Sequence, residues 1–215
     1  MFDQSKLQAI KANLVSKEDA IKGRDQEMQI TAVHAVNNED MKRGLLANEE
    51  RIVLGMGCFW GAERKLWNTP GIKVTSVGYA GGYTLNPTYE EVCTGETGHT
   101  EVVNVIFDRN QINLDSVLKV FWENHNPAQG MKQGNDIGTQ YRSAIYITDL
   151  SQQATVEQSL QAYQKGLNDS GFGAITTECD ILNVYYFAEE YHQQYLHKNI
   201  DGYCGLKGTG VTCAI

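Results

Sequence analysis

The pattern of hydrophobic and polar positions predicts four strands and two helices in the middle of the chain. An apolar run that ends in glycine and three further short segments, two of them alternating and rich in β-branched residues, are typical of strands. Trp60, Arg64 and Trp67 have the spacing of one helix face. The clearest helix begins after a candidate N-cap, Asn113. In chain order we predict a strand at 52–56, a helix at 59–67, strands at 72–79 and 101–107, a helix at 114–125 and a strand at 143–147.

This order, β-α-β-β-α-β, is that of split β-α-β sheets. We therefore expect an α+β fold, a ferredoxin-like two-layer sandwich with long loops and an extended C-terminal tail. The two long loops are predicted at 80–100 and 128–141. After the last of these strands we predict a helix that Ser151 caps and that runs to about residue 167, a strand at 175–182 and a helix at 188–198.

The chain divides into three parts by composition and pattern. Residues 1–45 are predicted to form a peripheral arm, with a short amphipathic helix over 4–14. Residues 46–198 form the domain that carries the candidate chemistry. Residues 199–215 are rich in glycine and hold two cysteines, which predicts a mobile tail.

The balance of charge argues against two classes of partner. The 215 residues include 18 Lys and Arg and 26 Asp and Glu, which gives a formal net charge of −8. Neither a nucleic-acid binder nor a membrane-surface protein is expected without a basic patch. The most apolar stretch, 52–62, is shorter than the about 20 residues of a membrane span, and the N-terminus lacks the apolar core of a signal peptide. We expect a cytoplasmic protein.

Cys58 is the candidate nucleophile. It stands between glycines at a strand-to-helix junction, Gly55-Met56-Gly57-Cys58-Phe59-Trp60-Gly61. The N-terminus of a helix stabilises a thiolate, so the position favours a lowered thiol pKa. A buried structural cysteine at the base of the helix is the alternative that the spacing leaves open.

Two further thiols, Cys204 and Cys213, lie in the glycine-rich tail. A flexible segment suits disulfide exchange, which requires the Cα atoms of the two cysteines to come within about 7 Å. A zinc site would require closer cysteine spacing or a nearby histidine pair, and the tail has neither. Cys93 and Cys179 are predicted to be small hydrophobic fillers.

The remaining polar candidates carry a weaker signal. The two Glu-x-x-His strings, Glu96–His99 and Glu189–His192, are interpreted as coincidence, and we expect no metal. His192 is expected to hydrogen-bond to Tyr or Glu neighbours. Glu101 opens a strand and, on the residues alone, is an exposed carboxylate at the strand end. The long loops also bring together phenol, amide and carboxyl groups: Tyr79, Tyr83, Tyr89, Asn135, Asp136 and Tyr141.

These residues resemble the signature of the A class of peptide methionine sulfoxide reductases. The segments that carry the likeness are Gly57-Cys58-Phe59-Trp60-Gly61, Gly78-Tyr79-Ala80-Gly81-Gly82, Asn86-Pro87-Thr88-Tyr89, Gly98-His99-Thr100-Glu101, 121–127 and 136–143. Tyr203-Cys204-Gly205 followed by Cys213 is similar to the three-cysteine members. The likeness runs from about residue 30 to the C-terminus.

The resemblance implies reduction of the S epimer of methionine sulfoxide, free or in proteins, and hence repair of oxidised proteins. Cys58 would attack the sulfoxide sulfur and become a sulfenic acid. Cys204 would condense with it, Cys213 would take over the disulfide, and thioredoxin, or dithiothreitol in vitro, would reduce it. No bound cofactor is implied, and we expect a monomer.

The resemblance also assigns the pocket. A neutral Glu101 would hydrogen-bond to or protonate the sulfoxide oxygen, while Tyr89 and Tyr141 add donors. Asp136 would orient the site, and Phe59 and Trp60 would hold the methyl group. An ionised Glu101 beside Cys58 would raise the thiol pKa, so we expect a thiol that is mostly protonated until substrate binds.

Two alternative functions, a second type of cysteine enzyme and a binding module, lead to different predictions. A cysteine hydrolase or acyltransferase would use His99 or His125 as base and Asn124 or Asn126 as orienter, and would need no reductant. A peptide-binding module would grip a side chain in a tyrosine-lined groove and would function without Cys58. Neither gives the tail cysteines a role.

Overall fold

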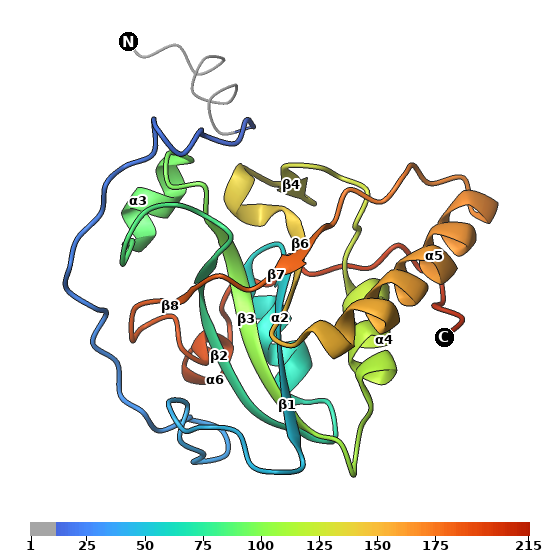
Figure 1. Ribbon diagram of the computed structural model, residues 1–215, viewed down its shortest axis with the longest axis horizontal. Helices are drawn as coiled ribbons and strands as arrows, with labels where there is room; N and C mark the ends of the chain where they lie inside the picture. Colours follow the sequence, from blue (N-terminus) through green and yellow to red (C-terminus); the bar gives the residue numbers. More distant parts are fainter. Residues whose placement is uncertain (1–11) are drawn as a thin grey trace.

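The computed structural model describes residues 12–215 and has a curled sheet of six strands at its centre (Figure 1). The strands lie in the order β7-β6-β1-β3-β2-β8. Only β6 and β7 are parallel, and all other neighbours are antiparallel. In chain order the bounds are β1 Glu49–Met56, β2 Ile72–Ala80, β3 Thr100–Asp108, β6 Ser143–Ile147, β7 Glu178–Ile181 and β8 Tyr185–Phe187.

Three helices cover one face of this sheet. They are α2 (Phe59–Trp67), α4 (Leu114–Asn124) and α5 (Gln153–Asp169). Their apolar stripes pack with inward-facing residues of β1, β2, β3 and β6 into one core cluster. The side chain of Asn113 accepts the N–H of Ser116, so this residue is the N-cap of α4 that the sequence predicts.

The opposite face of the sheet is covered in part by the N-terminal arm, which runs along the outer side of the molecule (Figure 1). Met41 packs against Val74 of β2 and Ile106 of β3. Nearer its N-terminal end, the arm forms an isolated β-bridge between Gly23 and Leu85. The helix predicted at 4–14 falls mainly on residues 1–11, outside the described part of the chain.

One end of the sheet gathers the residues that the sequence singles out. Because β1, β2, β3 and β6 alternate in direction, the last residues of β1 and β2 lie beside the first residues of β3 and β6. Tyr79 is paired with Glu101, and Met56 is paired with Ser143. The chain leaves this end of β1 through Gly57 and Cys58 and enters α2.

Two predictions about the loops are wrong. The segment 80–100 contains a short helix, α3 (Tyr89–Thr94), which a capping box of Thr88 and Glu91 begins and Gly95 ends. The segment 128–141 contains a two-stranded hairpin, β4 (Lys132–Gln133) with β5 (Asp136–Ile137), and a 3-10 turn at Thr139–Tyr141. The helix, the 3-10 turn and the hairpin are all too short to produce a periodic pattern.

The C-terminal predictions also need correction. Asp149, not Ser151, accepts the capping N–H, and it caps a 3-10 turn (Leu150–Gln152) that precedes α5. The helix expected at 188–198 is confined to α6 (Tyr195–Lys198). A left-handed Gln194 immediately before α6 interrupts the helical path.

The four strands of the predicted motif lie in the order β6-β1-β3-β2. Two further strands, β7 and β8, lie at the two edges of the sheet. The predicted four-stranded sandwich does not include them. The mixed α and β character is therefore confirmed, while the ferredoxin-like assignment stays a prediction.

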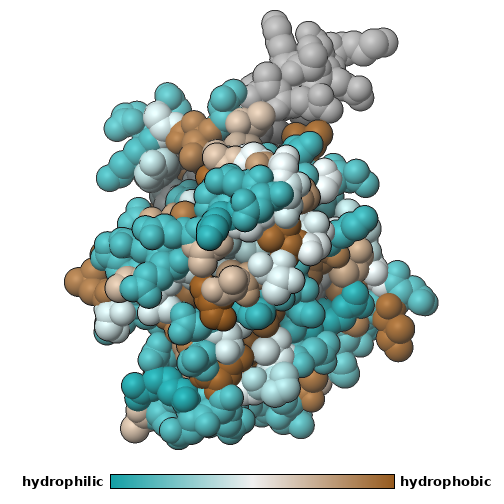
Figure 2. All heavy atoms as spheres, turned by 90° about the vertical axis from the view of Figure 1, so that its right-hand side faces the viewer, coloured by the Kyte–Doolittle hydropathy of each residue, from teal (hydrophilic) through white to brown (hydrophobic). Residues whose placement is uncertain are grey.

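The tail from 199 to 215 has no regular secondary structure and lies against the helices. Tyr163 of α5 hydrogen-bonds to Thr209, and the N–H of Cys213 donates to Glu123 of α4. The surface on this side is mostly hydrophilic, with scattered apolar side chains (Figure 2). In the described residues, no helix has the length and apolar character of a membrane span.

Candidate functional site

Cys58 occupies the turn between β1 and α2 and is partly exposed. The turn depends on Gly57, whose φ of 86° suits glycine and whose missing Cβ leaves room for Gln133. Gln133 holds the backbone of Asn126 at both its N–H and its carbonyl. The β4–β5 hairpin is thereby packed on the turn, and it brings Asp136 to the site.

Glu101 lies buried beside the turn. Its Oε2 accepts the backbone N–H of Phe59 at 3.0 Å. Burial raises the pKa of Glu101 to about 8, although this hydrogen bond acts in the opposite direction. The carboxyl group is therefore neutral near pH 7, unlike the exposed carboxylate that its sequence context alone indicates.

The pKa of Cys58 is raised, not lowered. Burial is the main cause, and Glu101 adds to it, while a hydrogen bond from the N–H of Trp60 lowers the pKa in part. The predicted effect of the helix N-terminus is thus outweighed by desolvation. The resemblance implies a protonated resting thiol as well, but there an ionised Glu101 is the reason, whereas here burial of the thiol is the main cause.

Three further predicted residues surround this pair. Tyr89 begins α3, Tyr141 ends the 3-10 turn, and Asp136 is in β5. Burial and the nearby Glu101 raise the pKa of both phenols, which therefore remain hydrogen-bond donors. Asp136 accepts from Tyr203 of the tail at 3.3 Å.

Phe59 and Trp60 form one side of the site together with aromatic residues from the C-terminal segment. Phe59 is buried, with its ring 5.0 Å from that of His192. The indole N–H of Trp60 donates to Nδ1 of His192 at 3.0 Å, and the indole stacks on Tyr195 at 4.0 Å between ring centroids. The ring of His192 therefore accepts from a tryptophan, and its Nε2 lies 3.9 Å from Oε2 of Glu189. The backbone of His192 also bonds to its neighbours Glu189 and Tyr195, as the sequence predicts.

His192, Tyr195 and Tyr203 are site residues to which the sequence analysis gave no role in the site. They come from segments more than 130 residues beyond Cys58. The aromatic residues at 191–195 were the available signal for two of them, but this segment was predicted only as part of a helix.

The two tail cysteines lie in different places. Cys204 is exposed, and its Sγ sits where a Cβ on Gly61 of α2 would approach it to 3.0 Å. Cys204 is also close enough to Cys58 to add to the rise in the pKa of that thiol. Cys213 is buried in the core cluster, where its N–H donates to Glu123 of α4. None of the five cysteines, all of which lie in the described residues, forms a disulfide.

The profile of the peptide methionine sulfoxide reductase family matches residues 50–212. The chain belongs to this family. The matched segment includes every site residue named above except Cys213.

Several peptide methionine sulfoxide reductases are close relatives over nearly the whole chain. A protein of Vibrio parahaemolyticus, peptide methionine sulfoxide reductase MsrA, is 58% identical over 94% of this chain and 95% of its own. The mitochondrial peptide methionine sulfoxide reductase of Bos taurus is 52% identical over 95% of this chain and 88% of its own.

Solved structures of this family share the fold. Methionine sulfoxide reductase A of Corynebacterium diphtheriae is 45% identical, covers 94% of this chain and 99% of its own, and has a TM-score of 0.85. Mxr1 from Saccharomyces cerevisiae in reduced form is 29% identical over 80% of this chain and 95% of its own, with a TM-score of 0.67.

The histidines of the hydrolase alternative are engaged elsewhere in this peptide methionine sulfoxide reductase. His99 contacts the N–H of Gly82 and the carbonyl of Thr84. His125 contacts the carbonyl of Phe121 and the hydroxyl of Ser143. Burial lowers the pKa of both to about 4, and neither bonds to Cys58.

The other thiols and the Glu-x-x-His strings show no metal cluster. Across residues 12–215, no three His, Cys, Asp or Glu side chains are grouped to hold a metal ion. Cys179 is exposed, so its prediction as a filler is wrong. Cys93 is partly exposed at the end of α3 and acts electrostatically on Tyr89 and Tyr141.

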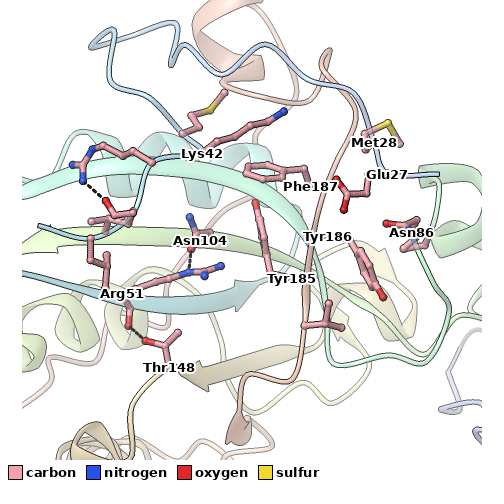
Figure 3. Close-up of a pocket in the computed structure, with 17 residues that line it drawn as sticks. Glu27, Met28, Lys42, Arg51, Asn86, Asn104, Thr148, Tyr185, Tyr186 and Phe187 are labelled. Carbon is pink, nitrogen blue, oxygen red and sulfur yellow. Dashed lines mark hydrogen bonds between the residues drawn. The ribbon is translucent and has the colours of Figure 1, made fainter. Parts of the chain in front are cut away.

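A cavity of about 700 Å³ lies on the other side of the sheet, between the arm and β8 (Figure 3). Arg51, Asn104 and Tyr185 line it, and the guanidinium of Arg51 lies over the ring of Tyr185. None of the predicted site residues lines it. The cavity therefore does not belong to the cysteine site of this family member.

Proposed function

We propose that the protein reduces the S epimer of methionine sulfoxide, free or in proteins, to methionine and thereby repairs oxidised proteins. Membership of the family supports the activity. The observation that carries the chemistry is the pairing of a protonated Cys58 with a neutral, buried Glu101 at one end of the sheet. Sulfoxide reduction requires both a sulfur nucleophile and a proton for the departing oxygen.

In the first step the sulfur of Cys58 attacks the sulfoxide and takes its oxygen. The substrate gains two electrons and leaves as methionine, while Cys58 becomes a sulfenic acid. Glu101 donates its proton to the sulfoxide oxygen as the S–O bond weakens, and the proton that leaves the Cys58 thiol restores the carboxyl group. The phenols of Tyr89 and Tyr141 donate hydrogen bonds to the same oxygen, and Asp136 orients the site. Their common proximity to Glu101 supports these roles.

The choice of epimer follows from two unlike sides of the pocket. Phe59 and Trp60 offer apolar surface for the methyl group, whereas Glu101 and the two phenols face the oxygen. Exchanging the methyl group and the oxygen would leave buried donors without acceptors, at a cost of about 1–3 kcal/mol each.

The tail completes the cycle. The thiol of Cys204 condenses with the sulfenic acid, which releases water and forms a Cys58–Cys204 disulfide. Cys213 then attacks Cys204 and frees Cys58, and thioredoxin, or dithiothreitol in vitro, reduces the remaining disulfide. The position of Cys204 beside Gly61 supports the first exchange. Cys213 must leave its buried position before the second.

We also propose the organisation that suits this cycle. Residues 1–45 form an arm, 46–198 the catalytic domain with a ferredoxin-like core, and 199–215 a mobile tail. The order β6-β1-β3-β2 supports the core assignment. The free thiols are compatible with a cytoplasmic location. A monomer without a bound cofactor suffices, because every named group comes from one chain.

The proposal is tested by counting thiols and methionine in the absence of reductant. Methionine sulfoxide of S configuration should yield methionine with loss of two thiols, and mapping should place the disulfide among Cys58, Cys204 and Cys213. Cys204→Ser should release about one equivalent of methionine and then stop even with thioredoxin. Cys58→Ser should release none. Normal turnover by Cys58→Ser would contradict the proposal, and an acyl-enzyme burst would favour the hydrolase alternative.

A further inference from the structure

Gln194 is buried and has a left-handed backbone conformation. Its φ is 47° and its ψ is 42°, a region that residues with a side chain rarely adopt. Such a conformation persists when surrounding contacts enforce it. The position matters because Gln194 stands between His192 and Tyr195, the two residues that contact the indole of Trp60.

Glu63 of α2 supplies two of the contacts that enforce it. Its Oε2 accepts the backbone N–H of Gln194 at 2.8 Å, and its Oε1 accepts the side-chain amide of Gln194 at 2.8 Å. The arm adds a third contact, since the N–H of Ala35 donates to Oε1 of Gln194 at 3.1 Å. Both polar ends of the Gln194 side chain are thus held.

The carboxyl group of Glu63 is itself fixed by a chain of hydrogen bonds that leads back to the arm. Nδ1 of His34 accepts the N–H of Val36, so the ring proton is on Nε2. Nε2 then donates to Oγ1 of Thr75 at 2.9 Å, and the hydroxyl of Thr75 donates to Glu63 at 3.1 Å. Each donor in this series of hydrogen bonds, from Val36 to Glu63, has one acceptor.

The neutral state of the His34 ring agrees with this direction of the hydrogen bonds. Burial lowers the pKa of His34 to about 4, so its ring is neutral near pH 7. Burial raises the pKa of Glu63 to about 7, and its hydrogen bonds from Gln194 and Thr75 act against that rise. The Thr75 hydroxyl, the backbone N–H of Gln194 and the side-chain amide of Gln194 all donate to this carboxyl group. A glutamine in its place would keep the length of the side chain but would offer only one acceptor oxygen.

We propose that Glu63 is a positioning residue for the substrate pocket, held in place by Thr75 and by His34 of the N-terminal arm. It fixes Gln194 in the left-handed conformation and thereby sets His192 and Tyr195 against Trp60. The proposal rests on the proposed function, because the pocket is the one assigned to the methyl group. It also gives the arm a part in substrate binding without any contact to substrate.

The first test separates binding from chemistry in single turnovers of the full chain, with a methionine sulfoxide peptide as substrate. Glu63→Gln and Thr75→Val should raise the half-saturating concentration about tenfold, while the maximal rate of methionine release changes less than about twofold. Val has nearly the shape of Thr but no hydroxyl. Thr75→Ser should behave nearly as wild type, and Glu157→Gln on the exposed side of α5 is the control for the change of carboxyl to amide.

The second test needs no activity. In protein labelled with ¹⁵N-tryptophan, the indole N–H signal of Trp60, assigned with Trp60→Phe, should move in Glu63→Gln and Thr75→Val. The signal of Trp122, whose indole bonds to Ser159, should stay in place. If the wild type releases no methionine, the proposed function fails, while this signal still decides the positioning role.

Wild-type half-saturation with an unmoved Trp60 signal in both variants would overturn the inference. A fall in maximal rate at unchanged half-saturation would overturn it as well. Should Glu63→Gln fail to fold, the comparison of Thr75→Val with Thr75→Ser decides, since both keep the carboxyl group.

Discussion

The backbone N–H of Phe59 donates to Oε2 of Glu101 at 3.0 Å. This N–H is one of the free donors at the start of α2, where a helix favours negative charge. The N–H of Phe59 thus bonds to the carboxyl group of Glu101, and the next N–H, that of Trp60, bonds to the sulfur of Cys58. The start of the helix is therefore shared between the nucleophile and the acid, and neither is ionised near pH 7.

The first prediction concerns the proton that Glu101 carries. Methionine release in a single turnover should slow as the pH rises through about 8, because the ionised carboxylate no longer donates to the sulfoxide oxygen. Glu101→Ala should lose a factor of about 10²–10⁴ in this rate. Glu101→Gln should lose less, since the amide still donates, and its profile should lack the fall near pH 8. Equal losses in the two variants would refute the proton role.

The second prediction concerns stability. The folded-state pKa of Glu101, about 8, exceeds its ordinary value of 4.5, so the folded protein binds this proton more tightly than the unfolded chain. Its contribution to stability is complete below pH 4.5 and is lost as the pH rises toward 8. The free energy of unfolding of the wild type minus that of Glu101→Gln should fall by about 1.4 kcal/mol per pH unit in this window.

Urea unfolding at several pH values measures this difference. The comparison with Glu101→Gln removes the effect of the buried histidines, whose lowered pKa values destabilise the fold as the pH falls. Glu157→Gln, at an exposed position of α5, should leave the curve of the wild type unchanged. A flat difference between pH 5 and 8 would mean that Glu101 is ionised in the folded state.

The local sequence was sufficient to predict β1 and α2, the two elements that flank Cys58. The apolar run before Gly57 and the spacing of Trp60 and Trp67 placed β1 and α2, and Asn113 marked the start of α4. These elements have long periodic patterns that agree with their burial. The shorter elements, such as α3 and β8, depend on a capping box or on sheet pairing, which hydrophobic periodicity does not report.

The environment of the site could not be predicted in the same way. Glu101 looks like the exposed end of a strand, because its burial comes from the tyrosines and α2 packed around it. The pKa of Cys58 depends on the balance between the helix start and desolvation, and the second is a property of the folded chain. His192 and Tyr195 reach Trp60 through the left-handed Gln194, which no local pattern announces.

The third prediction concerns the approach of the tail to α2. A Cβ at Gly61 would lie 3.0 Å from Sγ of Cys204 and 3.0 Å from Cβ of Leu206. Gly61→Ala should therefore push the tail away and slow formation of the Cys58–Cys204 disulfide roughly tenfold, while the first release of methionine stays within about twofold. Rapid quenching followed by mass spectrometry separates the two steps. Gly44→Ala, where a Cβ meets nothing within 4 Å, is the matched control.

The fourth prediction concerns access to Cys213. Burial, with Glu123 nearby, raises the pKa of this thiol to about 11, whereas Cys204 is exposed. Alkylation at pH 7.5, followed residue by residue by mass spectrometry, should therefore modify Cys213 about 10² times more slowly than Cys204. Tyr163→Phe removes the hydrogen bond to Thr209 that holds the tail and should speed alkylation of Cys213 several-fold. Tyr83→Phe, at an exposed tyrosine, is the control. Equal rates at the two thiols would show that the tail leaves the helices without hindrance, and recycling would then need no release step.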